Sequence, residues 1–509
     1  MFIEALSPIL WLVIALSILK LPAWKACPVA LVISFIMANQ FFYLPLQDTI
    51  TATLEGVALA CWPILAVIIA AIFTYNLSVS TKNMDKIKDM LSSVSTDKRM
   101  LILIIAWGFG GFLECMSGFG TAVAIGASML VSVGVNPIAA IIACLLANSV
   151  PTAYGSIGLP LTTLSKLTEF DASQIATYAT IQLGFVMIIM PFIMVIAFGG
   201  GLKALRGMIP ACLIAGVFYF IPSLATSYFM GAGLAGVAGA IFSMGFLVLY
   251  AKKFPVKDSE YEIDDYDANF SVTPGEAIKA WLPFILIFIF LMLSSKLFPT
   301  IHNALSQVVT RVMIYTGEGA TPYTFSWLTA PGTLIMAAAL ISGFIQKASV
   351  SEMAGVFSRT IKTLVPTFIT IITIISTARI MGYSGMTTTV AETTVAATGM
   401  LYPLISPFIG SVGAFITGSA TSSCVLLGKL QVDSSIVIGA TQNAQAWIAA
   451  ANATGSCIGK IISPQSIAIG AAAVGAFGVE SQIMKFAVKV YLPFILIMGC
   501  IIYFGQVLL

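Results

Sequence analysis

The feature that most constrains this chain is an apolar stretch, residues 107–160, whose helical pattern is interrupted twice. The first interruption is the run SGFGT at 117–121, and the second, at 148–158, begins NSVPT. An unpaired backbone amide in a bilayer costs several kcal/mol, so a broken helix survives there only where it lines a cavity enclosed by protein. Glu114 lies four residues before Gly118, and a carboxylate near the bilayer centre costs about 3 kcal/mol on insertion scales. The stretch is therefore predicted to form a binding site within a membrane.

A second stretch, residues 413–464, repeats this arrangement near the C-terminus. The glycine-containing turn of the second stretch, 417–421, aligns with the turn at 117–121. After the turn, three further residues align in pairs: Asn452 with Asn148, Gly459 with Gly155, and Pro464 with Pro160. Two glycine- and alanine-rich apolar runs can match by chance, but the common spacing favours a repeat. Paired broken segments in two halves of a chain point to the substrate site of a transporter.

Composition indicates an all-α polytopic membrane protein. Of the 509 residues, 59% are hydrophobic and 9% are charged, whereas soluble proteins carry about 25% charged residues. The apolar runs leave no soluble domain large enough for a separate enzyme, and the formal charge of +3 does not indicate a nucleic-acid partner. The single histidine, His302, excludes a histidine-based metal site, and we expect no metal and no cofactor.

Charge distribution predicts the topology. Lysine and arginine cluster in short segments that should face the cytoplasm: 20–25, 82–99, 203–206, 252–257 and 347–362. This pattern is satisfied if the runs 100–133 and 402–428 are each re-entrant hairpins or each cross the membrane an even number of times, and we expect about 12 spans plus two re-entrant hairpins. The two repeats then have inverted topology with discontinuous helices, and both termini lie outside.

Four regions follow from this topology. We expect N-terminal scaffold spans at 1–99 and a first repeat core, a hairpin plus a broken helix, at 100–203. Further scaffold spans with a cytoplasmic acidic loop at 252–275 occupy 204–385, and the second, inverted core occupies 386–509.

The two hairpin turns supply the first candidate site residues. They are rich in residues that turn tightly and cap helices: Ser117, Gly118, Gly120, Thr121, Gly418, Ser419, Thr421, Ser422 and Ser423. A half-helix that starts after such a turn directs its N-terminal amides into the cavity, where they favour a carboxylate. The alternative is close helix packing through small residues, which explains glycine and alanine better than it explains the hydroxyl residues.

Two asparagines mark the predicted unwound centres, Asn148 at 148–152 and Asn452 at 452–456. Pro151 removes one backbone amide, and Gly455 is expected to loosen the second segment through its flexibility. Freed carbonyls and the asparagine side chains can hold a hydroxyl group or a small cation. A proline-kinked span without a ligand is the alternative.

Three charged residues within the spans are further candidates. Arg379 and Lys460 are cations that could neutralise an anionic substrate, although Arg379 could instead reach the membrane interface. Glu114 has no acidic counterpart in the second repeat, and a single protonatable carboxylate in a buried site suits proton coupling. It could equally pair permanently with Lys460 or Arg379.

Five runs of the chain resemble the bacterial L-lactate permease family: GFLECMSGFGTAVAIG, NSVPTAYGSIGLP, ARIMGYSGM, GAFITGSATSSCVLLGKLQ and AANATGSCIGKIISPQSIAIG. The resemblance covers roughly residues 60–500. It implies a proton-linked symporter of L-lactate, D-lactate or glycolate with inverted repeats and re-entrant hairpins. It also places several residues at motif positions, namely Glu114, Gly118, Gly120, Asn148, Arg379, Ser422, Ser423, Asn452, Lys460 and Gln465.

The chain departs from the family pattern where Cys115, Ala122, Ala420 and Cys424 replace glycine, proline, an acidic residue and asparagine. Because the acid is missing at Ala420, a sodium-coupled carboxylate transporter of the same architecture is the alternative. The main expectation is a secondary transporter, not an enzyme, in the bacterial inner membrane. Its partners are a small carboxylate, protons and the lipid bilayer, and the chain is compatible with a homodimer.

Overall fold

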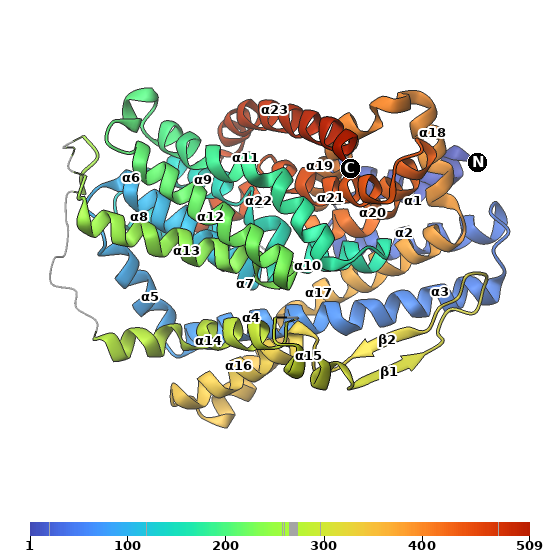
Figure 1. Cartoon of the computed structure of the whole chain (residues 1–509), viewed down its shortest axis with the longest axis horizontal. Coiled ribbons are helices and arrows are strands. Elements are labelled where there is room, and N and C mark those ends of the chain that lie inside the picture. Colours follow the sequence, from blue (N-terminus) through green and yellow to red (C-terminus); the bar gives the residue numbers. More distant parts are fainter. Residues whose placement is uncertain are drawn as a thin grey trace.

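The computed structural model is helical, and its described residues contain one two-stranded hairpin (Figure 1). It describes residues 1–509 except 20, 119, 257, 259, 264–272, 296 and 477, and it does not describe the side chains of 17, 18, 121 and 416. The helices of the first half are α1 (Phe2–Val13), α2 (Ala23–Gln40), α3 (Leu46–Leu59), α4 (Ala66–Ser80), α5 (Asn83–Ser92), α6 (Lys98–Leu101), α7 (Gly110–Ser117), α8 (Thr121–Ser132), α9 (Pro137–Ala147), α10 (Gly155–Thr168), α11 (Ala172–Phe198), α12 (Ile209–Met230) and α13 (Ala232–Lys253). The remaining elements are α14 (Pro274–Leu293), α15 (Pro299–Ser306), β1 (Val309–Val312), β2 (Tyr323–Ser326), α16 (Pro331–Ile345), α17 (Val350–Tyr383), α18 (Met386–Thr398), α19 (Tyr402–Thr417), α20 (Ala420–Val437), α21 (Gln442–Lys460), α22 (Pro464–Ala473) and α23 (Glu480–Gly505).

Apolar helices dominate the molecule. In the described part of the chain, nine helices are long and apolar enough to cross a membrane, and the number rises to ten if the bent pair α9–α10 forms one span. The prediction of an all-α polytopic membrane protein is confirmed. The finer prediction of about 12 spans and two re-entrant hairpins stays a prediction.

The first core unit is a helical hairpin followed by a broken helix. A π-helical segment, Ile102–Phe109, joins α6 to α7, and α7 ends at Gly118 with φ 65° and ψ −153°, a backbone conformation that glycine alone adopts readily. α8 then turns back and packs along α7 and the π-helical segment. The break predicted at 148–158 is confirmed, because α9 and the segment that begins at Pro151 meet at an angle of 59°.

The second core unit repeats the hairpin with one difference in the helix that follows. α19 ends at Gly418, which has a φ of 68°, and α20 begins directly afterwards. α21 is continuous to Lys460, so the prediction that the chain unwinds at 452–456 is wrong. The first unit has Pro151, which lacks an N–H, whereas this segment of the second unit has no proline and remains helical. The interruption falls instead at 461–463, before α22.

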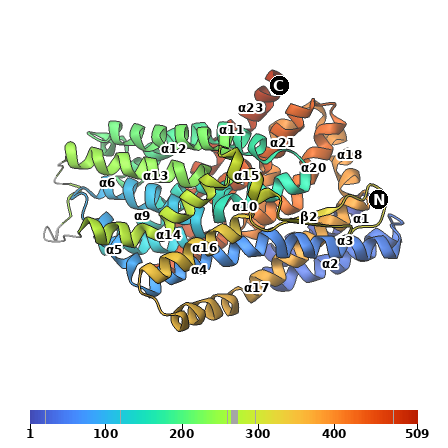
Figure 2. The same ribbon diagram turned by 60° about the horizontal axis from the view of Figure 1, so that its bottom comes forward.

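The two units interlock through reciprocal contacts. The second part of the first broken helix, α10, packs against α20 of the second hairpin, while α22 packs against α8 of the first hairpin. α11, α12 and α13 cover one side of this core, and α2, α3 and α17 lie on another side (Figure 2). The β1–β2 hairpin lies beside α3 (Figure 1), where the Thr316 hydroxyl donates to Asp48 and the Tyr323 hydroxyl donates to the Trp62 carbonyl.

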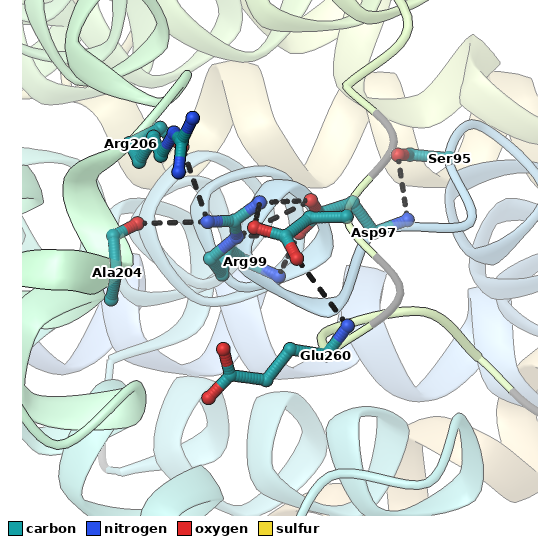
Figure 3. Close-up of polar contacts among 7 residues, drawn as sticks. Ser95, Asp97, Arg99, Ala204, Arg206 and Glu260 are labelled. Carbon is teal, nitrogen blue, oxygen red and sulfur yellow. Dashed lines mark hydrogen bonds and ion pairs between the residues drawn. The ribbon is translucent and has the colours of Figure 1, made fainter.

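The buried Arg99, at the start of the first hairpin, bonds residues of two loops that lie far away in the sequence. Arg99 and Asp97 are both fully buried, and an Arg99 Nη lies 2.6 Å from Asp97 Oδ2. The other Nη donates to the carbonyls of Ala204 and Arg206 in the connection between α11 and α12 (Figure 3). Asp258, which follows α13 in the acidic loop, contributes a further carboxylate 3.5 Å from Arg99. Part of the predicted acidic loop is therefore docked on the core, while residues 264–272 lie outside the described residues.

Small residues on α21 allow the closest helix contact of the second unit. A Cβ added to Gly455 or Gly459 would collide with the backbones of Pro407 and Ser411 on α19. The four-residue spacing of these glycines places both on one face, as in other close contacts between membrane helices. This contact fixes α21, and with it Lys460, against the second hairpin.

Replacing Gly459 by valine is therefore expected to push α21 away from α19 and to lower the unfolding temperature of the purified protein in detergent. Overpacking of this kind costs about 1–3 kcal/mol. The matched control is Gly245→Val on α13, where no atom lies within 4 Å of an added Cβ. Equal unfolding temperatures for the two variants, measured by fluorescence, would contradict the interpretation.

Candidate binding cavity

A cavity of about 840 Å³ lies where the two hairpin turns meet the two helix breaks. Gly120 from the first turn and Gly418 from the second both line it, so residues of both repeats face the same cavity. The predicted site residues that line the cavity are Glu114, Gly120, Gly418, Ser419, Thr421, Ser422, Lys460 and Gln465.

A further part of the cavity wall comes from residues that the sequence analysis did not assign to the site. Trp24 at the start of α2, together with Thr367 and Thr370 of α17, lines this wall. A signal for α17 was present in the sequence, because its threonines recur every three or four residues and so share one helix face: Thr360, Thr363, Thr367, Thr370, Thr373 and Thr377. Trp24 carries no comparable signal.

A buried ion pair crosses the cavity wall between the two repeats. Lys460 Nζ donates to Glu114 Oε1 over 2.7 Å, and the two side chains are 7% and 2% exposed. Among the described residues, the second carboxylate oxygen, Oε2, has no hydrogen-bond partner. A buried pair whose lone pairs are not all satisfied is a poor source of stability.

The turns hold this pair in place through contacts with the helix breaks. A Cβ added to Gly118 would lie 2.6 Å from Ser156 Oγ, and that hydroxyl donates to the Ser117 carbonyl over 3.0 Å. In the second unit a Cβ on Gly418 would collide with the Gln465 side chain. Each turn therefore lies directly against the break of its own unit. This packing places Glu114 of the first unit beside Lys460 of the second.

Two helices begin at the cavity. α20 starts after Ser419, whose Oγ accepts from the amide of Ser422 over 3.2 Å. α22 starts at Pro464 after Ser463, whose side chain does not cap the helix, so the first-turn amides of Gln465 and Ser466 are not taken up by this residue. Helix N-termini carry a partial positive charge and free N–H groups, and they bind anions. The α22 N-terminus follows Lys460 by four residues. The Lys460 ammonium and the helix N-terminus therefore both contribute positive charge to the same cavity.

Hydroxyl groups at the second turn differ in their availability. The Thr417 hydroxyl donates to the Gly413 carbonyl and also accepts from the Ser419 amide, so it stabilises the turn. Thr421 and Ser422 line the cavity, and no hydrogen bond engages their hydroxyls in the described part of the chain. These two groups are free to contact a ligand. The side chain of Thr121 at the first turn lies outside the described side chains.

Several predicted residues lie behind the cavity wall. The amide of Asn452 accepts from Gln431 and donates to Ser423, whose own hydroxyl bonds the Gly410 carbonyl. This network joins α19, α20 and α21. Asn148 is 3% exposed, and neither its Nδ2 nor its Oδ1 has a hydrogen-bond partner within the part of the chain that the structure describes. Ser117 and Gly118 also do not line the cavity, since the Ser117 hydroxyl bonds its own helix at Leu113.

Arg379 lies away from the cavity in a separate charged cluster. Its Nε is 3.3 Å from Glu55 Oε1 on α3, and the Tyr383 hydroxyl lies 3.0 Å from both Glu55 oxygens. Sequence reasoning did not single out Glu55, although an acidic residue in an apolar run such as 46–80 is the available signal.

The fold and this site define a polytopic membrane protein whose helices surround a charged cavity. A protein-family model described as L-lactate permease matches residues 1–509. The chain belongs to the L-lactate permease family, which confirms the resemblance seen in its motifs. The predictions of a permease rather than an enzyme, and of a multi-pass protein of the bacterial membrane, are also confirmed.

Named relatives match most of the chain. An L-lactate permease of Streptococcus iniae is 41% identical over 455 residues, which cover 89% of this chain and 94% of that protein. An L-lactate permease of Escherichia coli strain K12 is 34% identical, covering 97% and 94%. The glycolate permease GlcA of the same strain is 32% identical, covering 98% and 94%. Among solved structures, MtrF of Neisseria gonorrhoeae is similar in fold, with a TM-score of 0.50, 14% identity and 96% of each chain covered.

Replacing Lys460 by methionine should destabilise the protein, because Glu114 then remains buried without a counter-ion. Breaking a buried pair in this way costs about 3–5 kcal/mol. The double variant Lys460→Met with Glu114→Gln should recover most of the loss in unfolding temperature. The control is Lys86→Met, which removes a pair with Glu276 whose side chains are 44% and 50% exposed, and it should change little. A double variant no more stable than Lys460→Met would contradict the pairing.

Proposed function

We propose that this protein imports a small 2-hydroxy monocarboxylate, such as L-lactate, D-lactate or glycolate, by proton symport across the bacterial inner membrane. The observation that carries the proposal is the buried Lys460–Glu114 pair in the wall of the cavity formed by both repeats. The names of the relatives, L-lactate permease and glycolate permease, supply the substrate class.

Lys460 and the N-terminus of α22 form the proposed binding site for the substrate carboxylate. The ammonium group and the first-turn amides after Pro464 offer donors to one small anion. The N-terminus of α20, which also opens on the cavity, adds its partial positive charge. Arg379, the other predicted cation, is paired with Glu55 outside the cavity, so Lys460 is assigned the main role.

Charge balance supplies the coupling. In the empty site the charges of Lys460 and Glu114 cancel. A bound carboxylate would make the buried group of charges negative, and an uncompensated buried charge costs several kcal/mol. Protonation of Glu114 restores neutrality and releases Lys460 to the substrate. One proton per monocarboxylate follows from this exchange of partners.

The free hydroxyls of Thr421 and Ser422, and the Gln465 amide, are the proposed contacts for the substrate 2-hydroxyl. All three side chains line the cavity. Asn148 and Asn452, which the sequence suggested for this role, lie behind the wall. The residues at the start of α20 and α22 therefore recognise the substrate hydroxyl, on the same side of the cavity as the proposed carboxylate-binding groups.

The membrane topology remains part of the proposal. The positive clusters place both termini outside and give the two repeats opposite orientations. The reciprocal packing of α10 on α20 and α22 on α8 supports this arrangement, because an exchange of contacts is what a two-fold relation between repeats produces.

Glu114→Gln should abolish accumulation of L-lactate in proteoliposomes driven by an inward proton gradient, because the coupling proton has no acceptor. Exchange of labelled for unlabelled L-lactate should persist, since the glutamine carbonyl can still accept from Lys460. Asp433→Asn is the control: Asp433 is 5% exposed, belongs to α20 and does not line the cavity. Accumulation by Glu114→Gln would exclude the proton role. A rate of L-lactate uptake that requires sodium and does not change with pH would support the sodium-coupled alternative.

Ser422→Ala should narrow the preference for L-lactate over propanoate, which lacks the 2-hydroxyl. Loss of one hydrogen bond of about 1 kcal/mol corresponds to a change of roughly fivefold in the ratio of kcat/KM values. Ser435→Ala is the matched control on the same helix, because the Ser435 hydroxyl bonds the Val432 carbonyl of its own helix. An unchanged ratio for Ser422→Ala would remove this hydroxyl from the site.

A further inference from the structure

The cavity is larger than lactate requires. Its volume is about 840 Å³, whereas L-lactate occupies about 100 Å³, roughly the share of three water molecules in the liquid. Cavities of this size commonly hold ligands several times larger than lactate. The proposed contacts for the carboxylate and the 2-hydroxyl use only the start of α20 and α22 beside Lys460. Much of the lining is therefore left without an assigned contact.

Five residues of this remaining lining belong to one apolar cluster. They come from three parts of the chain that are distant in sequence: the segment that leads into α2, helix α10 and helix α17. The residues, here called the apolar wall, are Leu16, Leu21, Ala23, Leu159 and Ile371. Leu159 and Ile371 are 5% and 4% exposed, so this part of the wall belongs to the packed interior.

The two helix breaks that border the cavity differ in polarity. In the alignment of the two repeats, Lys460 corresponds to Ser156, and Ser463 corresponds to Leu159. The first break thus has a hydroxyl where the second has a cation, and that hydroxyl donates to the Ser117 carbonyl over 3.0 Å. One break is therefore charged, while the other is uncharged and carries part of the apolar wall. A ligand with a carboxylate and a hydrocarbon group matches both.

Hydroxyls on the first break and on α17 offer a ligand few free donors. Thr152 donates to the Asn148 carbonyl over 2.6 Å, and Thr370, which precedes Ile371, donates to the Pro366 carbonyl over 2.9 Å. Both threonines line the cavity. Because these donors are already used, burial of hydrocarbon is the main interaction that this part of the lining can add.

Helix α20 connects the polar part of the cavity to the apolar cluster. Thr421 and Ser422, the proposed contacts for the substrate hydroxyl, are followed four residues later by Val425 and Leu426. These two residues pack in the same apolar cluster as Leu159. One turn of helix advances about 5–6 Å, a distance that a branched or aromatic side chain can span. A substituent on C2 of a bound 2-hydroxy acid therefore lies within reach of the apolar wall.

We propose that the apolar wall binds the hydrocarbon side chain of the substrate. The transporter then carries 2-hydroxy monocarboxylates with branched or aromatic side chains, such as 2-hydroxyisocaproate and 3-phenyllactate, in addition to lactate. The proposal rests on the proposed function, because it keeps the same contacts for the carboxylate and the hydroxyl and adds one for the rest of the molecule. Hydrophobic burial grows with the apolar area removed from water, so these acids bind more tightly than lactate.

Counterflow in proteoliposomes without a pH gradient tests this substrate class. The vesicles are loaded with L-lactate, 2-hydroxyisocaproate or 3-phenyllactate, and the entry of labelled L-lactate is measured. Both larger acids should drive entry, and external 2-hydroxyisocaproate should compete with a Ki about tenfold below the KM of L-lactate. 4-Methylpentanoate, which has the same carbon skeleton without the hydroxyl, should compete more weakly. This acid controls for partition into lipid.

Two variants test the apolar wall itself. Ala23→Phe fills the wall from the partly exposed start of α2 and should raise the ratio of the 2-hydroxyisocaproate Ki to the L-lactate KM about tenfold, because the larger side chain loses its space. Ile371→Thr places a hydroxyl in the wall and should raise this ratio about fivefold. Ala396→Phe, at an exposed position of α18 outside the cavity, should leave the ratio unchanged. The unfolding temperature of each variant checks that it is folded.

The outcomes separate this proposal from the proposed function. Normal exchange of L-lactate without competition by either larger acid overturns the apolar subsite alone and leaves the extra volume to water. Competition without counterflow makes these acids inhibitors and also overturns the proposal. Equal ratios for the wild type, Ala23→Phe and Ile371→Thr remove the side chain from the apolar wall. Absence of L-lactate exchange by the wild type overturns the proposed function itself.

Discussion

The ion pair between Lys460 and Glu114 is the constraint on which the rest of the structure depends. Each partner is supplied by a different repeat, so the two charges compensate each other only when both hairpins and both helix ends are in place. Separation of the charges at membrane depth would cost several kcal/mol. The glycines at the turns, the close α19–α21 contact and the reciprocal packing of α10 and α22 all serve to bring these two side chains within 2.7 Å.

Sequence reasoning singled out several residues that line this cavity because their signals are local and costly in a membrane. A glycine turn, a proline and a carboxylate each disturb an apolar helix, so Gly118, Pro151 and Glu114 stand out without any knowledge of the fold. The recurrence of the turn in the second half identified Gly418, and Lys460 was singled out as a cation within that second stretch. The contact between the repeats could not be derived in the same way, because it depends on which faces of distant helices meet.

Two interpretations lacked the same information. Asn452 was expected in an unwound segment, yet Gln431 and Ser423 satisfy its amide inside a regular helix. Arg379 was considered for the substrate, yet Glu55 neutralises it. In both cases the sequence showed a polar side chain in an apolar run but not the residue that bonds it. That bonding residue comes from a remote part of the chain. Polarity in a sequence shows that a partner is required, but only the packed structure shows whether the partner is protein or ligand.

The Arg99 cluster has a consequence for the order in which the molecule is assembled. Arg99 belongs to the start of the first hairpin, but its carbonyl partner Ala204 lies 105 residues later, beyond α11. Until that connection emerges from the ribosome, the guanidinium has only Asp97 and water around it and cannot be buried at low cost. The Arg99 cluster can therefore be complete only once residues 204–206 are present, and the Glu114–Lys460 pair can form only once α21, near the C-terminus, is in place.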